Sequence, residues 1–271
     1  LHLNVGYLLI YHGTEQFFKD HGIQIRLKLC EFDMDIDEVK AKITANTTIL
    51  LHGGGNFGDL YPQHQKIREA MVTHFPNNRI IVLPQTLYFK DTDNLQQSAK
   101  LFRTHADCHL IARDQRTFDT FKAFSEHVYL SPDMAHQLYG SLPCKTEMTG
   151  KALYFLRKDV EASQIEKEIT AALPAGAHIK DWDDLLSMVD NNVLALSWRL
   201  SKWANQRQAY WLKDQINRFW FRYTQGITKR VAKNFLSYDQ VTTTRLHGHI
   251  FSCLLEIPNT VCDNAYGKNK A

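Results

Sequence analysis

The sequence predicts an α/β protein built from two halves, each with a parallel sheet. Apolar runs typical of buried strands alternate with segments of helical period, and the connections between them are short. A glycine-bearing motif, His52–Tyr61, follows one such strand and precedes a helix, and a second motif, Thr243–His249, does the same near the other end of the chain. Open α/β sheets bind ligands beyond the carboxyl ends of their strands, so the two motifs predict one cleft between two α/β halves.

The first half of the chain begins with a loop at residues 4–6 and a helix over 8–18. Residues 23–30 alternate apolar and polar side chains, which is the period of a strand. The expected elements that follow are a helix at 33–43, a strand at 47–51, a helix at 61–75, a strand at 79–83 stopped by Pro84, a helix at 95–105, a strand at 108–112, a helix at 117–124 and a strand at 128–130. This alternation predicts βαβ units.

Glycine and proline residues weaken the pattern between residues 138 and 151. We expect a domain boundary there, with an N-terminal domain over residues 1–145 and a C-terminal domain over residues 146–271. The second domain is expected to have strands at 152–156, 241–244 and 260–262, and helices at 165–173, 184–190, 201–235 and 250–255. The long helical stretch is rich in aromatic and basic residues; we interpret its aromatic side as core packing, with a sugar-stacking or membrane-surface face as the alternative.

Composition limits the function classes. The 271 residues carry a formal net charge of +3, which is too small to indicate a nucleic-acid-binding protein. The five cysteines form no Cys-x-x-Cys pair, which favours a reducing, cytosolic compartment. The sequence shows no signal peptide and no run of about 20 apolar residues. Because residue 1 is Leu rather than Met, the interpretation that the sequence is a fragment stays open.

The first motif has the properties of an anion-binding loop. Its four glycines permit close backbone approach, and exposed N–H groups at a strand-to-helix junction attract anions. Asn56 adds an amide and Asp59 an acceptor. The spacing matches neither a dinucleotide fingerprint nor a Walker loop. A tight structural turn in which Asp59 caps the helix is the alternative.

The second motif places Arg245, His247 and His249 just after a strand. Arginine binds carboxylate or phosphate in bidentate fashion, and histidine transfers protons near neutral pH. No third ligand lies nearby, so no metal site is expected. A capped turn with a solvated arginine is the alternative. Other polar residues at strand ends are Gln85, Arg113, Asp114, Asp133 and Arg157.

The order of these motifs resembles the polysaccharide pyruvyl transferase family over nearly the whole chain. The matching pieces are Asn4–Gly6, Leu51–Leu60, Val82–Thr86, Ala112–Asp114, Ser131–Asp133, Thr244–Gly248 and Asp263–Lys268. The resemblance implies a GT-B-like fold of two Rossmann-like domains facing a central cleft. It also implies transfer of pyruvate from phosphoenolpyruvate to two hydroxyls of a sugar, which gives a cyclic ketal.

Roles for individual residues follow from that reaction. The donor carries a carboxylate and a phosphate, so we assign substrate binding to Arg113 and Arg245, and proton transfer to His247 with Asp59 as its carboxylate partner. Further substrate-binding residues are expected to be His52, Gly54, Gly55, Asn56, Gln85 and Leu246. No metal or other cofactor is implied. The acceptor is expected to be a glycan or a lipid-linked sugar, in the cytoplasm or at the inner face of the membrane, which leaves a peripheral membrane association open.

The chain departs from the family pattern at two points. The early motif usually reads Asn-x-Gly-Asp, but Tyr7 occupies the acidic position, and the chain stops at Ala271 soon after the Tyr-Gly-Lys motif. Two alternative functions therefore stay open. One is a glycosyltransferase of the same architecture that uses a sugar nucleotide, and the other is a non-catalytic glycan-binding subunit.

Overall fold

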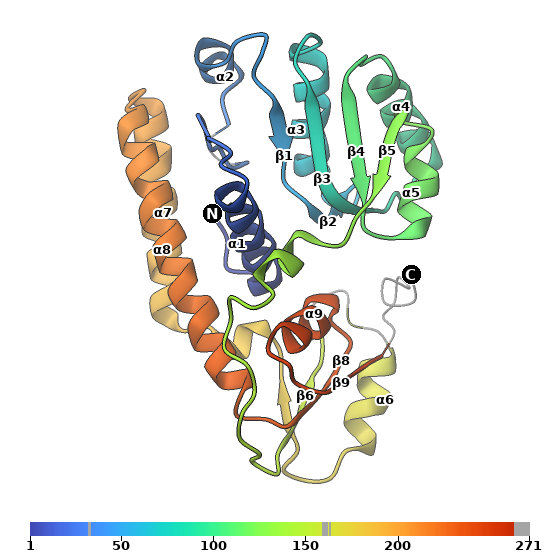
Figure 1. The fold of residues 1–271 in the computed structure, drawn as a ribbon, viewed down its shortest axis with the longest axis vertical. Helices are drawn as coiled ribbons and strands as arrows, with labels where there is room; N and C mark the ends of the chain where they lie inside the picture. Colours follow the sequence, from blue (N-terminus) through green and yellow to red (C-terminus); the bar gives the residue numbers. More distant parts are fainter. Residues whose placement is uncertain (32–33, 159–161, 163, 263–271) are drawn as a thin grey trace. The chain divides into compact units, whose positions relative to one another are not determined.

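A computed structural model describes residues 1–31, 34–158, 162 and 164–262 (Figure 1). The chain divides into two compact units. The first, which we call the glycine-loop unit, comprises Phe18–Met134. The second, which we call the Arg-Leu-His unit, comprises Leu1–Phe17 and the described residues from Ala135 onward. Each unit has its own hydrophobic core and its own sheet.

The glycine-loop unit contains a five-stranded sheet. Its strands are β1 (Ile49–Leu51), β2 (Gly54–Phe57), β3 (Ile80–Leu87), β4 (Cys108–Ala112) and β5 (His127–Leu130). The order is β1-β3-β4-β5, and β2 pairs with the later part of β3. Every pairing is parallel. The carboxyl ends of β3 and β4 therefore lie at the same edge, as the strand–helix alternation predicts.

Helix α2 (Ile36–Lys42) precedes the first strand, and α3 (Pro62–His74), α4 (Thr92–Arg103) and α5 (Gln115–Phe121) connect the later strands. Asp91 is the N-cap of α4 and Asp114 is the N-cap of α5. Each carboxylate accepts hydrogen bonding from backbone N–H groups of the first helical turn. Phe57 of β2 packs against a group of buried phenylalanines, and its ring centroid lies 5.0 Å from that of Phe121. The glycine motif is thus joined to the core by its own phenylalanine.

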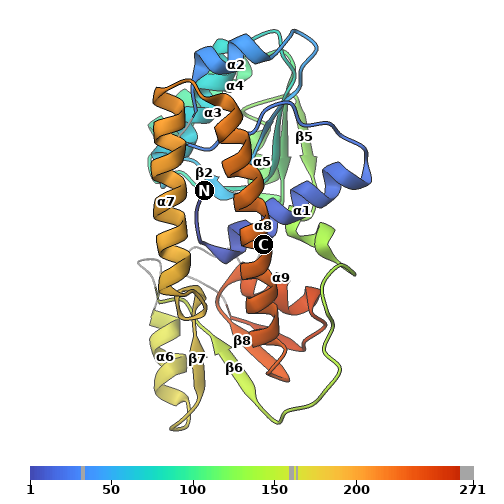
Figure 2. The same cartoon turned by 90° about the vertical axis from the view of Figure 1, so that its left-hand side faces the viewer.

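The Arg-Leu-His unit contains a four-stranded parallel sheet of order β7-β6-β8-β9. The strands are β6 (Ala152–Phe155), β7 (His178–Lys180), β8 (Gln240–Thr243) and β9 (Asn259–Val261). The helices are α6 (Gln164–Ala172), α7 (Met188–Gln206), α8 (Tyr210–Phe235) and α9 (Leu246–Leu254), with single 3₁₀ turns at Met134–Leu138 and Trp182–Leu185. Figure 2 shows α7 and α8 side by side as a long antiparallel hairpin.

The first helix, α1 (Val5–Asp20), begins in the Arg-Leu-His unit. Val5, Leu8 and Leu9 are at most 1% exposed and belong to the same core cluster as Phe155 and Phe235. The division into units therefore differs from the predicted domains of 1–145 and 146–271. The apolar side of an N-terminal helix packs against the C-terminal sheet, and residues 135–145 join that half as well.

Several element predictions need correction. Residues 23–30 form no strand; Leu27 and Leu29 pack against the core from an extended segment that pairs with none of the described strands. Strand β3 continues through Pro84, and its pairing with β4 shifts register between Val82 and Gln85, where proline cannot donate a backbone hydrogen bond. The predicted loop at residues 4–6 is helical from Val5.

The predicted helix at 201–235 is two helices. Ser187 is the N-cap of α7 and forms a reciprocal capping box with Asp190. Helix α7 therefore starts well before residue 201, where the sequence pattern placed the start of the helix. A turn then separates α7 from α8, with Gln208 at a backbone φ of 53°. The sequence stays rich in aromatic and basic residues across the turn, so its composition did not reveal that one helix ends and another begins there.

His12 on α1 makes the stability of the protein depend on pH. Its ring nitrogens lie 2.9 Å from Thr224 Oγ1 and 3.2 Å from Thr228 Oγ1, and burial lowers its pKa from 6.5 to about 4. Protonation thus favours the unfolded chain, so this stabilisation is complete above pH 6.5 and is lost as the pH falls toward 4. We expect a loss of about 3 kcal/mol over that window, to be measured by denaturant unfolding. His12→Gln should flatten this slope and exposed His21→Gln should not; equal slopes in both variants would contradict the assignment.

Candidate functional site

The Arg-Leu-His turn lies between the carboxyl end of β8 and the start of α9. Thr243 holds the turn, because its Oγ1 donates to Phe155 O at 2.8 Å and accepts from Arg245 N at 3.0 Å. Gly248 lets the helix approach the sheet: a Cβ there would lie 2.5 Å from Thr243 Oγ1 and 2.9 Å from Phe155 Cδ1. The motif thus places the first turn of α9, with its backbone N–H groups, at the edge where a parallel sheet binds ligands.

Arg245 is part of a buried bidentate ion pair. Its Nε donates to Asp181 Oδ1 at 2.7 Å and its guanidinium reaches Asp181 Oδ2 at 2.5 Å. Arg245 is 7% exposed and Asp181 is 2% exposed. Asp181 also accepts a backbone hydrogen bond from Lys158 at 2.8 Å. The solvated arginine of the alternative interpretation is wrong, and the charge of Arg245 is balanced within the protein.

His247 lies in the first turn of α9 against the first turn of α1. A Cβ on Gly6 would lie 2.8 Å from Cγ and Nδ1 of His247, so only glycine leaves room for the ring at this position. The ring centroid of Tyr7 lies 6.4 Å from that of His247, and the rings of His2 and Tyr7 are 5.5 Å apart. The early Asn-x-Gly motif and the Arg-Leu-His motif therefore meet at one place within one unit.

Arg157 belongs to the same edge of the sheet. It follows β6, and Phe155 at the end of β6 pairs in register with Thr243 at the end of β8. The backbone N–H of Arg157 donates to Thr244 Oγ1 at 3.2 Å. Its position after a strand made it a weak candidate in the sequence. The parallel pairing of β6 with β8 now places a second arginine beside the Arg-Leu-His turn.

The other two members of the second motif have different surroundings. Leu246 begins α9 and its side chain packs against the core. His249 points to β9, because its Nδ1 lies 2.6 Å from Asn259 Oδ1. In the Arg-Leu-His unit the structure thus brings Arg245, Leu246 and His247 together. The ring of His249 instead forms a hydrogen bond with Asn259.

The glycine motif forms part of the sheet in the glycine-loop unit. Gly54–Phe57 is strand β2, which the sequence pattern did not reveal because glycines are uncommon in strands. Gly58 has a φ of 122°, and a Cβ there would lie 1.8 Å from Tyr88 O. Only glycine fits at that position.

The buried side chains of Gln85 and Asn56 form a polar network with the backbone of the exposed His52. Gln85 Nε2 donates to His52 O at 2.7 Å and to Asn56 Oδ1 at 3.3 Å. Gln85 has no exposed surface, and its Oε1 is a buried acceptor without a donor among the described residues. Arg68 donates to both oxygens of Asn56. His52 Nδ1 lies 2.8 Å from Gly53 O, which can only accept, so Nε2 of the neutral ring is the free acceptor.

Arg113 joins this network at the carboxyl end of β4. Its Nε donates to Thr86 Oγ1 at 2.8 Å and its NH1 to Asp133 Oδ2 at 2.5 Å. The side chains of Arg113 and Asp133 are 6% and 3% exposed. A Cβ on Gly55 would lie 2.9 Å from NH2 of Arg113. Both arginines predicted to bind the donor are therefore paired with buried aspartates, a feature that local sequence does not show.

Asp59 anchors a loop. Its two oxygens accept backbone hydrogen bonds from Lys90 at 2.7 Å and Asp91 at 2.9 Å. Burial raises the pKa of this carboxyl, but these hydrogen bonds outweigh it and leave the pKa below 3.8. Helix α3 begins after Tyr61, so Asp59 does not cap it. Asp59 and His247 belong to different units, and their partnership stays a prediction from the sequence.

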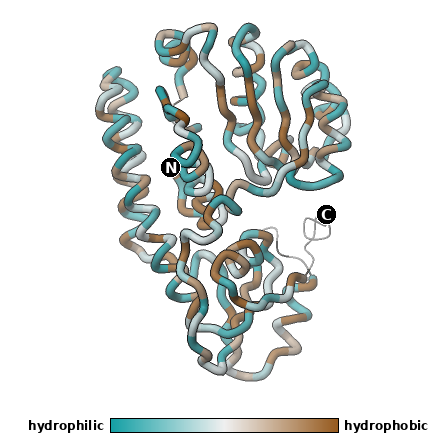
Figure 3. Tube along the Cα trace, viewed as in Figure 1, coloured by the Kyte–Doolittle hydropathy of each residue, from teal (hydrophilic) through white to brown (hydrophobic). Residues whose placement is uncertain are grey.

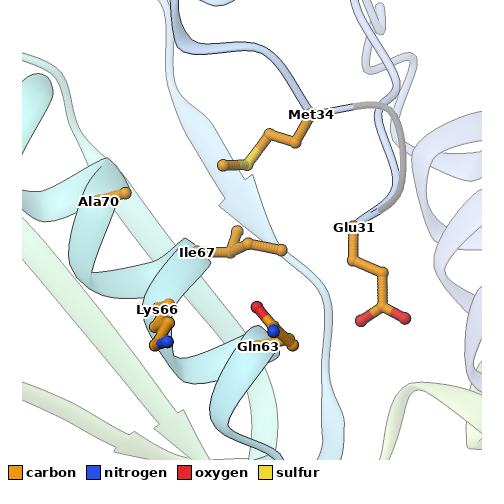
Figure 4. Close-up of a pocket in the computed structure, with 6 residues that line it drawn as sticks. All are labelled: Glu31, Met34, Gln63, Lys66, Ile67 and Ala70. Carbon is orange, nitrogen blue, oxygen red and sulfur yellow. The ribbon is translucent and has the colours of Figure 1, made fainter.

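A surface pocket of about 490 Å³ lies elsewhere in the glycine-loop unit, between α3 and the segment before α2 (Figure 4). It is lined by Glu31, Met34, Gln63, Lys66, Ile67 and Ala70. None of the predicted site residues lines it. The candidate site is therefore defined by strand ends and hydrogen bonds rather than by this pocket.

Comparison with known protein families identifies the family in which these motifs occur. The family model described as polysaccharide pyruvyl transferase matches residues 4–266. The chain belongs to this family. It is accordingly an enzyme of the pyruvyl transferase class, as the ordered motifs predicted. The last motif of the resemblance, Asp263–Lys268, lies outside the described residues.

Curated relatives carry matching names. The chain is 40% identical to "Putative pyruvyl transferase EpsO" of Bacillus subtilis (strain 168), covering 99% of this chain and 80% of that protein. It is 28% identical to "Pyruvyl transferase 1" of Schizosaccharomyces pombe, covering 97% of this chain and 64% of that protein. At 26% identity it also matches "General stress protein 30" of Bacillus subtilis, covering 98% of this chain and 73% of that protein.

A solved structure supports the fold. A functionally uncharacterised protein from Klebsiella pneumoniae matches with a TM-score of 0.63 at 20% identity, covering 99% of this chain and 82% of that chain. The α/β architecture with parallel sheets is thus confirmed. The described residues include no cluster of three or more His, Cys, Asp or Glu side chains arranged to hold a metal ion. Among them, too, no helix has the length and apolar character to cross a membrane.

Tyr7 offers a test of the family's acidic position. Because Tyr7 lies beside His247, Tyr7→Asp would place a carboxylate near the imidazole and favour its charged form. We expect this variant to raise activity or acceptor affinity and to shift the imidazole limb of the pH–rate profile upward. Tyr7→Asn, the uncharged control, should do neither. If both variants only lower the melting temperature, Tyr7 is a packing residue.

Proposed function

We propose that this pyruvyl transferase takes pyruvate from phosphoenolpyruvate and joins it to two hydroxyls of a sugar as a cyclic ketal. The acceptor is a sugar of a surface polysaccharide or of its lipid-linked precursor. The observation that carries the proposal is the placement of His247 in the first turn of α9, beside Arg245 at the carboxyl end of β8. This arrangement puts a proton-transfer group next to backbone N–H groups that favour anions.

The proposed donor site lies in the Arg-Leu-His unit. Phosphoenolpyruvate brings a carboxylate and a phosphate, which need more positive charge than the Arg245–Asp181 pair supplies. Arg157 is the further cation at this edge of the sheet, and the N–H groups at the start of α9, including that of Leu246, add hydrogen-bond donors. In this arrangement Arg245 holds the turn in place through its buried pair with Asp181.

The proposed reaction has two steps. A sugar hydroxyl adds to C2 of the enol while an acid delivers a proton to C3, which becomes a methyl group, and the hydroxyl proton leaves to a base. A second hydroxyl of the same sugar then displaces phosphate from C2 and closes the ring. His247 is the proposed acid for C3. Charge builds up at C2 as the proton arrives, and preorganised dipoles lower the barrier for such a step.

Within the glycine-loop unit, the substrate-binding roles of His52, Asn56 and Gln85 stay predictions from the sequence. Sugar hydroxyls donate and accept hydrogen bonds, and Nε2 of the exposed His52 is an acceptor that such a hydroxyl can reach. Gln85, which has no exposed surface, holds the backbone carbonyl of His52 in place. The Arg113–Asp133 pair holds the ends of β4 and β5 around this network.

Thermal shift and turnover together test the proposal. Phosphoenolpyruvate should raise the melting temperature, whereas a nucleoside diphosphate sugar should not, because only a ligand that binds the folded state stabilises it. Phosphate release should require both phosphoenolpyruvate and a glycoside with a suitably placed pair of free hydroxyls. Turnover with a sugar nucleotide would show a glycosyltransferase instead, and glycan binding without phosphate release would show a binding subunit.

A further inference from the structure

The hairpin of α7 and α8 has an inner side that packs and an outer side that meets solvent. Ser197, Ser201 and Ala204 of α7 are buried, as are Trp220, Thr224 and Ile227 of α8. The two helices pack against each other, and His12 of α1 bonds to Thr224. Figure 3 shows hydrophobic and hydrophilic residues alternating along the hairpin, and the exposed residues of the hairpin include large apolar ones.

Large apolar side chains lie on that outer side. Leu196, Leu200 and Trp203 follow at spacings of four and three residues, which places them on one side of α7. Trp203 is 51% exposed, and Trp211 at the start of α8 is 69% exposed. Because α7 ends at Gln206 and α8 begins at Tyr210, the two tryptophans stand on either side of the hairpin turn. Burial in the core, the interpretation favoured from the sequence, does not account for them.

The hairpin is also strongly basic. Between Met188 and Phe235 there are nine Lys and Arg residues and two Asp residues, a net charge of +7, whereas the whole chain carries +3. The remainder of the chain is therefore negative. Asp190 is paired with Arg230, whereas Asp214, the other acid of the hairpin, has no ion pair with any residue that the structure describes. The exposed cations other than Arg230 are Arg199, Lys202, Arg207, Arg218, Arg222, Lys229 and Lys233, and none of these seven forms an ion pair within the described part of the chain.

We propose that the α7–α8 hairpin docks this enzyme on the surface of an anionic phospholipid bilayer. Clustered Lys and Arg are attracted to anionic headgroups, and tryptophan is favoured at the boundary between headgroups and acyl chains. Leucine beside these tryptophans adds apolar area that a bilayer buries. A second copy of the chain fits less well, because a symmetric contact would set one +7 hairpin against another. Nucleic acid would match the charge and would leave Leu196 and Leu200 in water.

This inference goes beyond the proposed reaction and does not depend on it. Binding to vesicles is measured without donor or acceptor, so a failure of one proposal leaves the other standing. If both hold, docking would bring the enzyme to acceptors that are anchored in lipid. The hairpin residues in question are not assigned to catalysis or to donor binding, so variants there should keep activity on a water-soluble glycoside.

Vesicle sedimentation tests the docking. The full chain should bind vesicles of phosphatidylcholine with phosphatidylglycerol, and binding should fall with added salt and be absent with phosphatidylcholine alone. Each cation near an anionic surface strengthens binding about fivefold, so Arg218→Gln with Arg222→Gln should weaken it roughly 25-fold. Trp203→Ser with Trp211→Ser should weaken it as well. The matched control, Lys100→Gln with Lys151→Gln, removes two exposed cations outside the hairpin and should change little.

Three results would overturn the proposal. Equal binding to vesicles with and without phosphatidylglycerol would remove the electrostatic basis. Equal losses in the hairpin variant and the lysine control would show an effect of total charge. The third result combines two observations: the parent protein binds no vesicles, and the tryptophan variant changes its oligomeric state in analytical ultracentrifugation. Together they would show that a second copy of the chain covers the hairpin. Thermal melting of each variant separates these outcomes from loss of folding.

Discussion

Replacing Arg245 by alanine is expected to destabilise the protein by about 3–5 kcal/mol, because the change leaves the buried carboxylate of Asp181 without its cation. The assignment of Arg245 to donor binding also predicts the loss of one charge-assisted contact to the donor, roughly 1.5–3 kcal/mol in binding. The structure adds a larger cost in folding. Denaturant unfolding measures it directly, and donor kinetics should be compared only at temperatures where the variant is folded.

Two companion variants make this expectation specific. Arg245→Lys keeps the charge and loses the bidentate geometry, so it should recover only part of the stability. Arg245→Met with Asp181→Leu removes both charges and should be markedly more stable than Arg245→Ala while remaining inactive. A single Arg245→Ala variant as stable as the parent would contradict the buried ion pair.

Replacing His247 should act on the chemical step. Its role as the acid for C3 predicts a loss of roughly 10²–10⁴-fold in kcat for His247→Gln, with a smaller change in the affinity for phosphoenolpyruvate. The variant should also lose the limb of the pH–rate profile that reports this acid. His249→Gln is the matched control, because that ring is held by Asn259. If the limb persists in the His247 variant, another group is the acid and His247 is a binding or structural residue.

Local patterns predicted much of the fold. Runs of apolar residues located β4 and β8 to within a residue, because buried parallel strands need little more than hydrophobicity and a turn signal. The same patterns could not show which half of the chain α1 joins, since its apolar side would fit either core. Alternation alone misassigned residues 23–30, because a strand also needs a partner to pair with.

The candidate site shows a similar division. Motif order placed Arg245 and His247 at a strand end, and parallel pairing brought Arg157 to the same edge. The partner of Arg245 was not predictable, because Asp181 lies 64 residues earlier in the chain and no local spacing links the two. One feature of the sequence could have indicated these partners, because both aspartates lie after strands. Asp181 directly follows β7, and Asp133 comes soon after β5.

The fate of the donor's C3 carbon tests the central claim most directly. The enzyme would be incubated in D₂O with phosphoenolpyruvate labelled with ¹³C at C3 and with a glycoside that has two neighbouring free hydroxyls, and the product would be examined by NMR. The proposed mechanism predicts a ketal methyl group on the sugar that carries one deuterium, formed in step with phosphate release. Phosphate release that yields free pyruvate, or a sugar that gains phosphate, would contradict it.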